Sequence, residues 1–297
     1  MSAWDISENA SLDHTVLQVR EHGRGIWILK MASPATHNTL SPLLMGALAR
    51  AVDRLSSLDV QKVRVIILEA AGKSFSAGID INIIRDEPAL ETKMVRAIDP
   101  MYAIQESRVP VIACAAFTGG FELALSCDIR LASEDTVFRD NHAMCKRSLI
   151  RLFAGGVFYS ILMLVHTDGV HPTRGISQLL SRHCGPSNAK LASLASFPIP
   201  APLALRWNLV SQVVKSPDDL MPAALQIAES IVYNSAPLVN SLKKTIDVGS
   251  SLSYGEARKY ELQREAQYYN AMNSEALANS LEEGARRFDQ RVAELGP

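Results

Sequence analysis

Alternating apolar and polar residues near the N-terminus predict a β-hairpin. Val16 and Val19 alternate with polar residues, a glycine-containing turn follows at residues 22–25, and residues 26–29 form an apolar return run. A period of two is typical of a half-buried strand, and two such runs around glycines are typical of a hairpin. The pattern therefore predicts two antiparallel strands within residues 15–30.

The next patterns predict a helix followed by buried strands. Apolar residues recur at helical spacing over residues 43–55, directly after Ser41-Pro42, a typical helix start. Residues 63–68 and 109–115 are β-rich and mostly apolar, as in strands that are covered on both faces. Further along, the pattern predicts a short helix at residues 121–126 and a strand at residues 128–132. This succession of strand, loop, helix and strand predicts an α/β core.

The second half of the chain is mostly helical in pattern. Helices are predicted at residues 187–197, 217–233, 236–248 and 253–293, with Gly284 as a possible break. An apolar block at residues 149–165 shows neither helical nor strand periodicity and predicts no regular element. We expect an α/β core over residues 1–205, with an atypical insertion at about 144–170, and a helical region over residues 206–297.

Composition narrows the class of protein. The 297 residues carry 30 Lys and Arg against 31 Asp and Glu, and this balance argues against a nucleic-acid partner. The longest uncharged apolar run, residues 152–165, is shorter than the roughly 18 residues that span a bilayer. The four cysteines have no metal-site or disulfide spacing, which favours a reducing compartment. No targeting signal is recognisable, so the sequence does not choose among cytosol, mitochondrion and peroxisome.

Common catalytic motifs are absent from the sequence. Gly72-Lys73-Ser74 is not the end of a P-loop, because Ile67 stands where that motif needs glycine. There is no HExxH motif and no GxSxG motif. Two glycine-containing loops remain, residues 74–80 and 118–122, each following a buried strand. Backbone N–H groups in such loops can form an oxyanion hole, although the glycines can also serve only to close the sheet.

Four segments, two of which contain these loops, resemble the crotonase superfamily, which includes enoyl-CoA hydratases and isomerases. They are KSFSAGIDI (73–81), VPVIA (109–113), TGGFELALSCDIRLAS (118–133) and FRDNHA (138–143). The similarity resumes at residue 175 and continues to about residue 290. The resemblance implies an α/β fold with a ββα superhelical core, and C-terminal helices that build a homotrimer or a hexamer.

The resemblance also implies a substrate and a set of site residues. The substrate is an acyl-CoA thioester, so coenzyme A enters as part of it and no metal or redox cofactor is expected. Its carbonyl oxygen is expected between two backbone N–H groups, with further loop residues along the coenzyme A and one glutamate as acid and base. These residues are Ala77 and Gly119 for the oxyanion hole, Ala77, Gly78, Ile79, Asp80 and Gly119 for substrate binding, and Glu122 for catalysis. Asp80 can also be a turn cap, and Glu122 a partner of the helix dipole.

The chain departs from the family at three places. His142 stands where hydratases carry a second glutamate; imidazole can act as acid or base near neutral pH, or it can be structural here. The segment 114–117 is shorter than the family's loop and lacks its Asn-Gly dipeptide, which threatens the placement of the Gly119 N–H. The insertion before Pro172 is interpreted either as a lid or membrane-contact segment over the acyl pocket or as a splicing artefact.

These observations lead to one expected function and two alternatives. We expect an enoyl-CoA hydratase, a lyase that adds water in syn fashion to a 2-trans-enoyl-CoA in fatty acid β-oxidation or branched acyl-CoA breakdown. One alternative is an enoyl-CoA isomerase or another thioester-enolate reaction. The other is a catalytically impaired protein that binds coenzyme A or only oligomerises.

Overall fold

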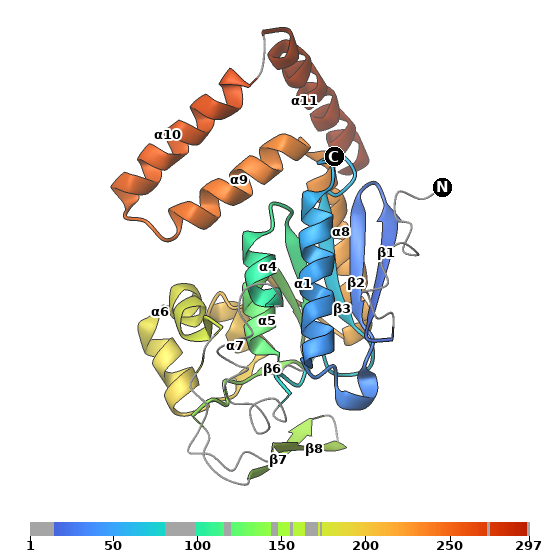
Figure 1. Cartoon of the computed structure of the whole chain (residues 1–297), viewed down its shortest axis with the longest axis vertical. Coiled ribbons are helices and arrows are strands. Elements are labelled where there is room, and N and C mark those ends of the chain that lie inside the picture. Colours follow the sequence, from blue (N-terminus) through green and yellow to red (C-terminus); the bar gives the residue numbers. More distant parts are fainter. Residues whose placement is uncertain are drawn as a thin grey trace.

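A six-stranded sheet forms the centre of the molecule (Figure 1). The computed structural model describes residues 15–80, 99–115, 120–143, 148–154, 157–163, 172, 174–271 and 274–295. The strands, in the order in which they lie in the sheet, are β1 (Leu17–Gly23), β2 (Ile26–Met31), β3 (Val65–Ala70), β4 (Val111–Ala115), β5 (Ile129–Ser133) and β10 (Gln212–Val214). β1 and β2 are antiparallel, which confirms the predicted hairpin, and the other neighbours are parallel.

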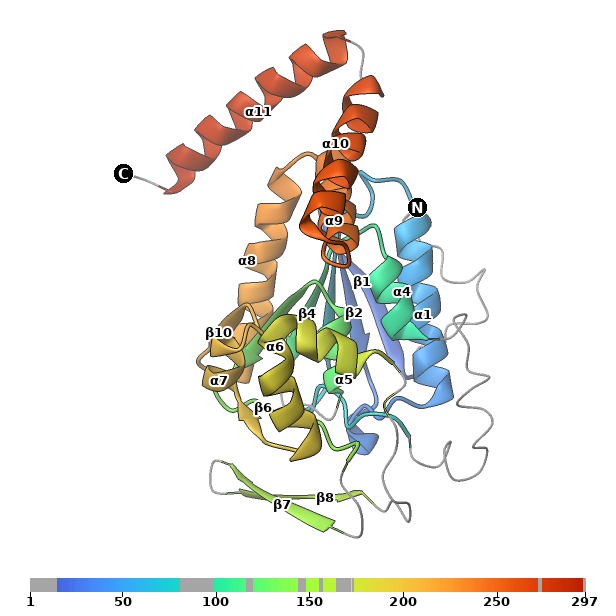
Figure 2. The same ribbon diagram turned by 90° about the vertical axis from the view of Figure 1, so that its left-hand side faces the viewer.

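Helices cover both faces of this sheet (Figure 2). α1 (Pro42–Ser57), α4 (Pro100–Glu106) and α5 (Phe121–Ser126) lie on one side, and α8 (Leu220–Tyr233) lies on the other. Successive strand residues alternate between the two cores: Ile67 packs in the cluster that contains α8 side chains, and Leu68 in the cluster that contains α1 side chains. Burial on both faces explains why the central strands have almost no polar positions.

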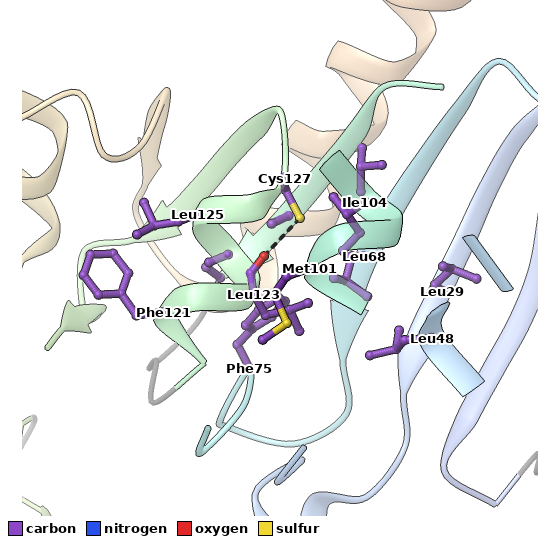
Figure 3. Close-up of a cluster of buried hydrophobic side chains, with 14 of the residues drawn as sticks. Leu29, Leu48, Leu68, Phe75, Met101, Ile104, Phe121, Leu123, Leu125 and Cys127 are labelled. Carbon is purple, nitrogen blue, oxygen red and sulfur yellow. Dashed lines mark hydrogen bonds between the residues drawn. The ribbon is translucent and has the colours of Figure 1, made fainter. Parts of the chain in front are cut away.

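Local sequence signals set the start of α1 and anchor the loop after β3. The Ser41 hydroxyl accepts a hydrogen bond from the Leu44 N–H at 3.3 Å, as a helix cap does, and Pro42 is the first helical residue. Phe75 is fully buried in the same cluster as Met101 and Leu123, where Figure 3 draws it. The glycine-containing loop is therefore fixed to the core by its own aromatic side chain.

The C-terminal part contains more helix than the pattern predicted. α6 (Ile176–Leu194) begins before the predicted start and is kinked at Gly185, whose φ of 77° is non-helical. α7 (Ala201–Arg206) follows, and β9 (Ile199–Pro200) pairs with β6 (Val137–Phe138). Gly185 and Pro186 interrupt the periodicity in mid-helix, and this is why the pattern predicted only its second part. Two 3₁₀ turns, Pro34–Thr36 and Pro217–Asp219, also precede α8.

Three helices end the chain. They are α9 (Ala236–Gly249), α10 (Tyr254–Asn270) and α11 (Ser274–Leu295). α9 is anchored through Lys243, which donates to Asp128 at 2.5 Å and to Asp247 at 2.8 Å. The prediction of a break at Gly284 is wrong: the helix is interrupted between Asn270 and Ser274, and Gly284 lies inside α11. One glycine costs a helix about 1 kcal/mol, which is too little to end it.

Two observations refine the predicted organisation. The expected boundary at residue 205 precedes β10 and α8, yet both belong to the central layers, since β10 pairs with β5 and α8 covers the sheet. The apolar block, for which the pattern indicated neither helix nor strand, contains β7 (Ser148–Ala154) and β8 (Val157–Met163), which form an antiparallel hairpin, a separate two-stranded sheet. Both runs are almost wholly apolar, so they carry no alternation to indicate strands.

No helix in the described part of the chain is long and apolar enough to cross a membrane.

Candidate active site

The loop after β3 is held in place by the segment around Asn38. The Asn38 side chain, which is fully buried, accepts from the Ser33 N–H at 2.9 Å and donates to the carbonyls of Ala71 and Ser74 at 2.9 and 2.8 Å. Leu40 extends the contact through its own N–H, which donates to the Gly78 carbonyl at 2.8 Å. The loop therefore has a defined backbone path as far as residue 80.

The two predicted glycine loops meet. The Gly120 N–H donates to the Ser76 carbonyl at 2.6 Å, and a Cβ added to Gly120 would lie 2.5 Å from the Cβ of Ser76. Only glycine allows this approach, because real Cβ contacts are never so short. Gly119, the second predicted oxyanion donor, lies outside the described residues, as do residues 116–118 of the shortened loop.

Within the first loop, the backbone N–H groups differ in their partners. The Ala77 N–H donates to the His37 carbonyl at 2.8 Å, so it is already used within the fold, although sequence analysis assigned it to the oxyanion hole. Two residues on, the Ile79 N–H has no hydrogen-bond partner among the described residues, while its neighbour Asp80 donates to the Leu40 carbonyl at 3.3 Å. Of Ala77, Ile79 and Asp80, Ile79 is therefore the residue whose N–H is left for a ligand; sequence analysis placed it along the substrate only.

Glu122 and His142 come together, as the resemblance implied. Glu122 lies in the first turn of α5, directly after the glycine contact, and is 8% exposed. Its Oε1 lies 3.7 Å from Nε2 of His142 and has no hydrogen-bond partner among the described residues. A buried carboxyl oxygen without a hydrogen bond is costly, and such groups collect at functional sites.

Asp140 completes this cluster, and sequence analysis missed it. Its Oδ1 lies 2.6 Å from Nδ1 of His142, and it also accepts from the His142 backbone N–H at 3.0 Å. The side chain of Asp140 is 1% exposed. The signal was present in the sequence, since an aspartate two residues before a histidine can reach both its backbone and its ring, but the family comparison drew attention only to position 142.

The surroundings set opposite protonation tendencies for the two carboxyls. Burial raises the pKa of Glu122 above its ordinary value of 4.5, and the positive charges of His142 and Arg174 offset this only in part. Burial alone would also raise the pKa of Asp140, but hydrogen bonds from His142 and Ser193 outweigh burial and lower it. Glu122 is therefore suited to carry a proton and Asp140 to stay ionised.

A buried arginine lies at the edge of this cluster. Arg174 is 8% exposed, and its Nε is 4.0 Å from the Asp99 carboxylate. Its Nε and Nη1 have no hydrogen-bond partner among the described residues. Neither Arg174 nor Asp99 was predicted as a site residue, because single charged residues in irregular segments carry no sequence signal.

The position of the cluster follows from the sheet. The loops that form it leave the carboxyl ends of parallel strands, the edge where ligands bind in open α/β sheets. A separate cavity of about 580 Å³ lies at the opposite edge, between the β1–β2 turn, the end of α8 and Arg287 of α11, and contains none of the predicted site residues. Among the described residues, no group of three or more His, Cys, Asp or Glu side chains could hold a metal ion.

A buried carboxyl whose pKa is raised, an imidazole 3.7 Å from it and a backbone N–H without a partner in the adjoining loop are the groups that proton transfer to a carbonyl compound needs. The chain belongs to the enoyl-CoA hydratase/isomerase family, whose model matches residues 21–145 and 164–291. The resemblance to crotonases is thereby confirmed. The match leaves out residues 146–163, which contain the β7–β8 hairpin.

Individual relatives match between about two thirds and nearly the whole of the chain. A protein of Arabidopsis thaliana described as probable enoyl-CoA hydratase 1, peroxisomal, is 31% identical over 275 residues, 92% of this chain and 94% of its own. The short-chain-enoyl-CoA hydratase of Clostridium acetobutylicum is 31% identical over 208 residues, 68% of this chain and 70% of its own. The solved structure of an enoyl-CoA hydratase from Mycobacterium smegmatis is 26% identical, with a TM-score of 0.71 over 93% of this chain and 96% of that chain.

Proposed function

We propose that the protein is an enoyl-CoA hydratase that adds water to a 2-trans-enoyl-CoA thioester. The observation that carries the proposal is the 3.7 Å approach of Glu122 Oε1 to His142 Nε2 beside the loop that ends in Ile79. Hydration needs one group to take a proton from water and another to give a proton to carbon. A protonated carboxyl and a neutral imidazole supply both at one place.

The backbone N–H of Ile79 is our candidate for one oxyanion donor. Negative charge collects on the thioester oxygen as water adds to the double bond, so a fixed donor stabilises the transition state more than the substrate. Removing one such donor typically costs about 10²–10³ in rate. Gly119, in the segment that runs into the Ser76–Gly120 contact, is our candidate for the second donor, and Gly78 and Asp80 for contacts to the coenzyme A moiety.

The proton transfers balance without a cofactor. His142 Nε2 takes one proton from water while the hydroxyl adds to C3, and Glu122 gives its proton to C2 of the enolate. This leaves an imidazolium beside a carboxylate. Because the two atoms lie 3.7 Å apart, the imidazolium can return its proton to Glu122 and restore both groups. Water is consumed, no oxidation state of the protein changes, and no metal ion or redox group takes part.

The hydratase function is favoured over the isomerase by the second acid–base group. Isomerisation moves one proton between two carbons of the substrate and needs only one such group, whereas here two are adjacent. Relatives in both a plant and a bacterium are described as hydratases. The proposed substrate class is therefore the conjugated enoyl-CoA.

The proposal is tested with crotonyl-CoA, by following the loss of its conjugated enoyl absorbance. We expect turnover by the unaltered protein and a loss of about 10²–10⁴ in kcat for Glu122→Gln, the range for removal of a general acid. Glu134→Gln, which changes an exposed carboxyl, is the matched control and should keep full activity. Absence of turnover above the Glu122→Gln level would refute the hydratase function, and binding of the thioester without turnover would support the catalytically impaired alternative.

A further inference from the structure

The contacts of Asp140 distinguish it from a carboxylate that merely neutralises charge. Its Oδ1 accepts from both the ring and the backbone N–H of His142, at 2.6 and 3.0 Å. The hydroxyl of Ser193, on α6, also donates to it. A carboxylate held from two elements and almost fully buried has one orientation, so it can fix the orientation of the ring it contacts.

This contact decides which ring nitrogen carries the proton. An ionised carboxylate only accepts hydrogen bonds, so the nitrogen 2.6 Å from Asp140 is the protonated one. In the neutral ring the lone pair then lies on Nε2, the atom that faces Glu122. The ring is thus set to accept a proton on the side of the substrate and to carry the resulting positive charge against Asp140.

The other charged groups at the cluster do not supply this orientation. Glu122 approaches from α5 on the Nε2 side, and Arg174 and Asp99 act on Glu122 from farther out. Among these groups, only Asp140 lies within hydrogen-bond distance of Nδ1. Its role is therefore not shared with another carboxylate of the described cluster.

We propose that Asp140 is a positioning residue for the hydration reaction: it holds His142 in the Nδ1-protonated form and stabilises the imidazolium that forms when His142 takes a proton from water. This inference rests on the proposed hydratase function and adds to it a residue that acts through His142, with a side chain that is only 1% exposed. Position 142 differs from the two-glutamate pattern of hydratases. An imidazole, unlike a carboxylate, accepts a proton on one defined nitrogen, and the contact with Asp140 makes that nitrogen Nε2.

The first test is the kinetics of Asp140→Asn, which keeps the shape of the side chain. We expect kcat for crotonyl-CoA to fall at least tenfold while KM stays within about twofold. The acid limb of the kcat/KM profile should move to lower pH, because an imidazole without a carboxylate neighbour releases its proton more readily. Asp135→Asn, an exposed aspartate in the preceding turn, should change neither quantity. The inference would be overturned if Asp140→Asn lost kcat only in proportion to its folded fraction and its profile of kcat/KM against pH did not move.

Repeating the Asp140→Asn substitution in a His142→Gln variant distinguishes a positioning role of Asp140 from a purely structural one. In His142→Gln protein, Asp140→Asn should cause no further loss of kcat, because the ring through which it acts is gone. The same tenfold loss in both backgrounds would show that Asp140 acts on the fold and would refute the inference.

Nitrogen NMR of the histidine rings shows the tautomer of His142 directly and does not depend on turnover. We expect the Nδ1-protonated form of His142 in the unaltered protein and a mixture of the two tautomers in Asp140→Asn. If the tautomer follows this expectation but crotonyl-CoA is not hydrated, the proposed function fails and the positioning role stands. If the tautomer is the same in both proteins, the positioning role fails whatever the turnover.

Discussion

Burial of the Glu122 carboxyl costs desolvation free energy, and no hydrogen bond to its Oε1 among the described residues offsets this cost. Its Oε1 has no hydrogen-bond partner among the described residues, and burial raises its pKa. A core position selected for stability alone would hold an apolar side chain or a satisfied amide. The proposed chemistry gives a reason for the carboxyl, because a raised pKa favours the protonated form that can donate to carbon.

This burial predicts how the stability of Glu122→Gln depends on pH. The pKa of Glu122 is raised in the folded state above its ordinary 4.5, so the folded state binds more protons and the unaltered protein loses stability as pH rises above 4.5. Glutamine does not ionise and escapes this loss. We expect Glu122→Gln to melt at a higher temperature than the unaltered protein at pH 8, and the difference to shrink toward pH 4.5. Each unit of elevation is worth about 1.4 kcal/mol.

Thermal melts of both proteins at several pH values measure this, with the exposed Glu134→Gln as control. A gap that is constant with pH, or that grows as pH falls, would contradict the prediction.

At the scale of elements, the segment 33–40 and the loop after β3 form one unit. The Asn38 side chain makes one hydrogen bond within the segment, to Ser33, and two to the loop, to Ala71 and Ser74. Asn38 also has a φ of 52°, in the left-handed region that asparagine tolerates better than most residues. Because the same loop continues to Ile79, Asn38 positions the candidate oxyanion donor as well as stabilising the fold.

Substitution at Asn38 separates these contributions. Asn38→Ala should lower the free energy of unfolding by about 2–4 kcal/mol, since buried backbone groups lose their partners and the left-handed φ becomes strained. Asn38→Gly loses the same hydrogen bonds without that strain, so it should recover about 1 kcal/mol. Urea denaturation measures the free energy of unfolding of both variants. The kcat should also fall in both, although Glu122 itself is not altered. Equal stability of the two would show that backbone strain contributes nothing here.

Prediction from sequence succeeded for most elements of the α/β core and did not reach the partners of particular N–H groups. The hairpin, α1, the buried strands and α5 follow from periodicity and from Ser41-Pro42, because these signals are local. The glycines of both loops predicted that the two loops contribute to one site, but not the particular contact of Gly120 with Ser76. The use of the Ala77 N–H by His37 could not be found this way, since it depends on a left-handed turn at His37 and Asn38 and on residues far apart in sequence.

At the scale of the whole molecule, the β7–β8 hairpin is an addition to the family's fold. Its strands pair only with each other in the described sheets, and the family model matches on both sides of it. Figure 1 draws it at the end of the molecule where the strands that feed the site loops terminate. We therefore expect it to affect access to the site more than the stability of the core.

Replacing residues 146–163 by a short Gly-Ser linker tests this. We expect the free energy of unfolding to change by less than about 1 kcal/mol, as for surface changes that remove no core contact. Activity toward crotonyl-CoA should persist, and the preference among longer enoyl chains should change. A same-length Gly-Ser replacement controls for the linker, and loss of the cooperative unfolding transition would show that the hairpin is part of the core.

The helices at the C-terminus present an apolar surface that the single chain does not cover. On α9, Leu238, Leu242 and Ile246 are spaced four residues apart, and they are 40%, 51% and 67% exposed. Residues at this spacing form one stripe along a helix. Large exposed apolar residues recur on α10 and α11, at Leu262 and Leu281. Exposed apolar residues in such a stripe are typical of interfaces, and we propose that this surface binds further copies of this chain, as the crotonase resemblance implied.

Charge placed in this stripe should therefore separate the subunits. Leu242→Glu with Ile246→Glu buries two carboxylates in any interface built on α9, which costs several kcal/mol and should reduce a trimer or hexamer to the monomer mass. Leu194→Glu is the matched control, because Leu194 on α6 is 76% exposed but lies outside the three helices. Sedimentation at micromolar concentration measures the mass of each protein. A monomeric mass for the unaltered chain, or equal dissociation by the Leu194→Glu control, would refute an interface on α9.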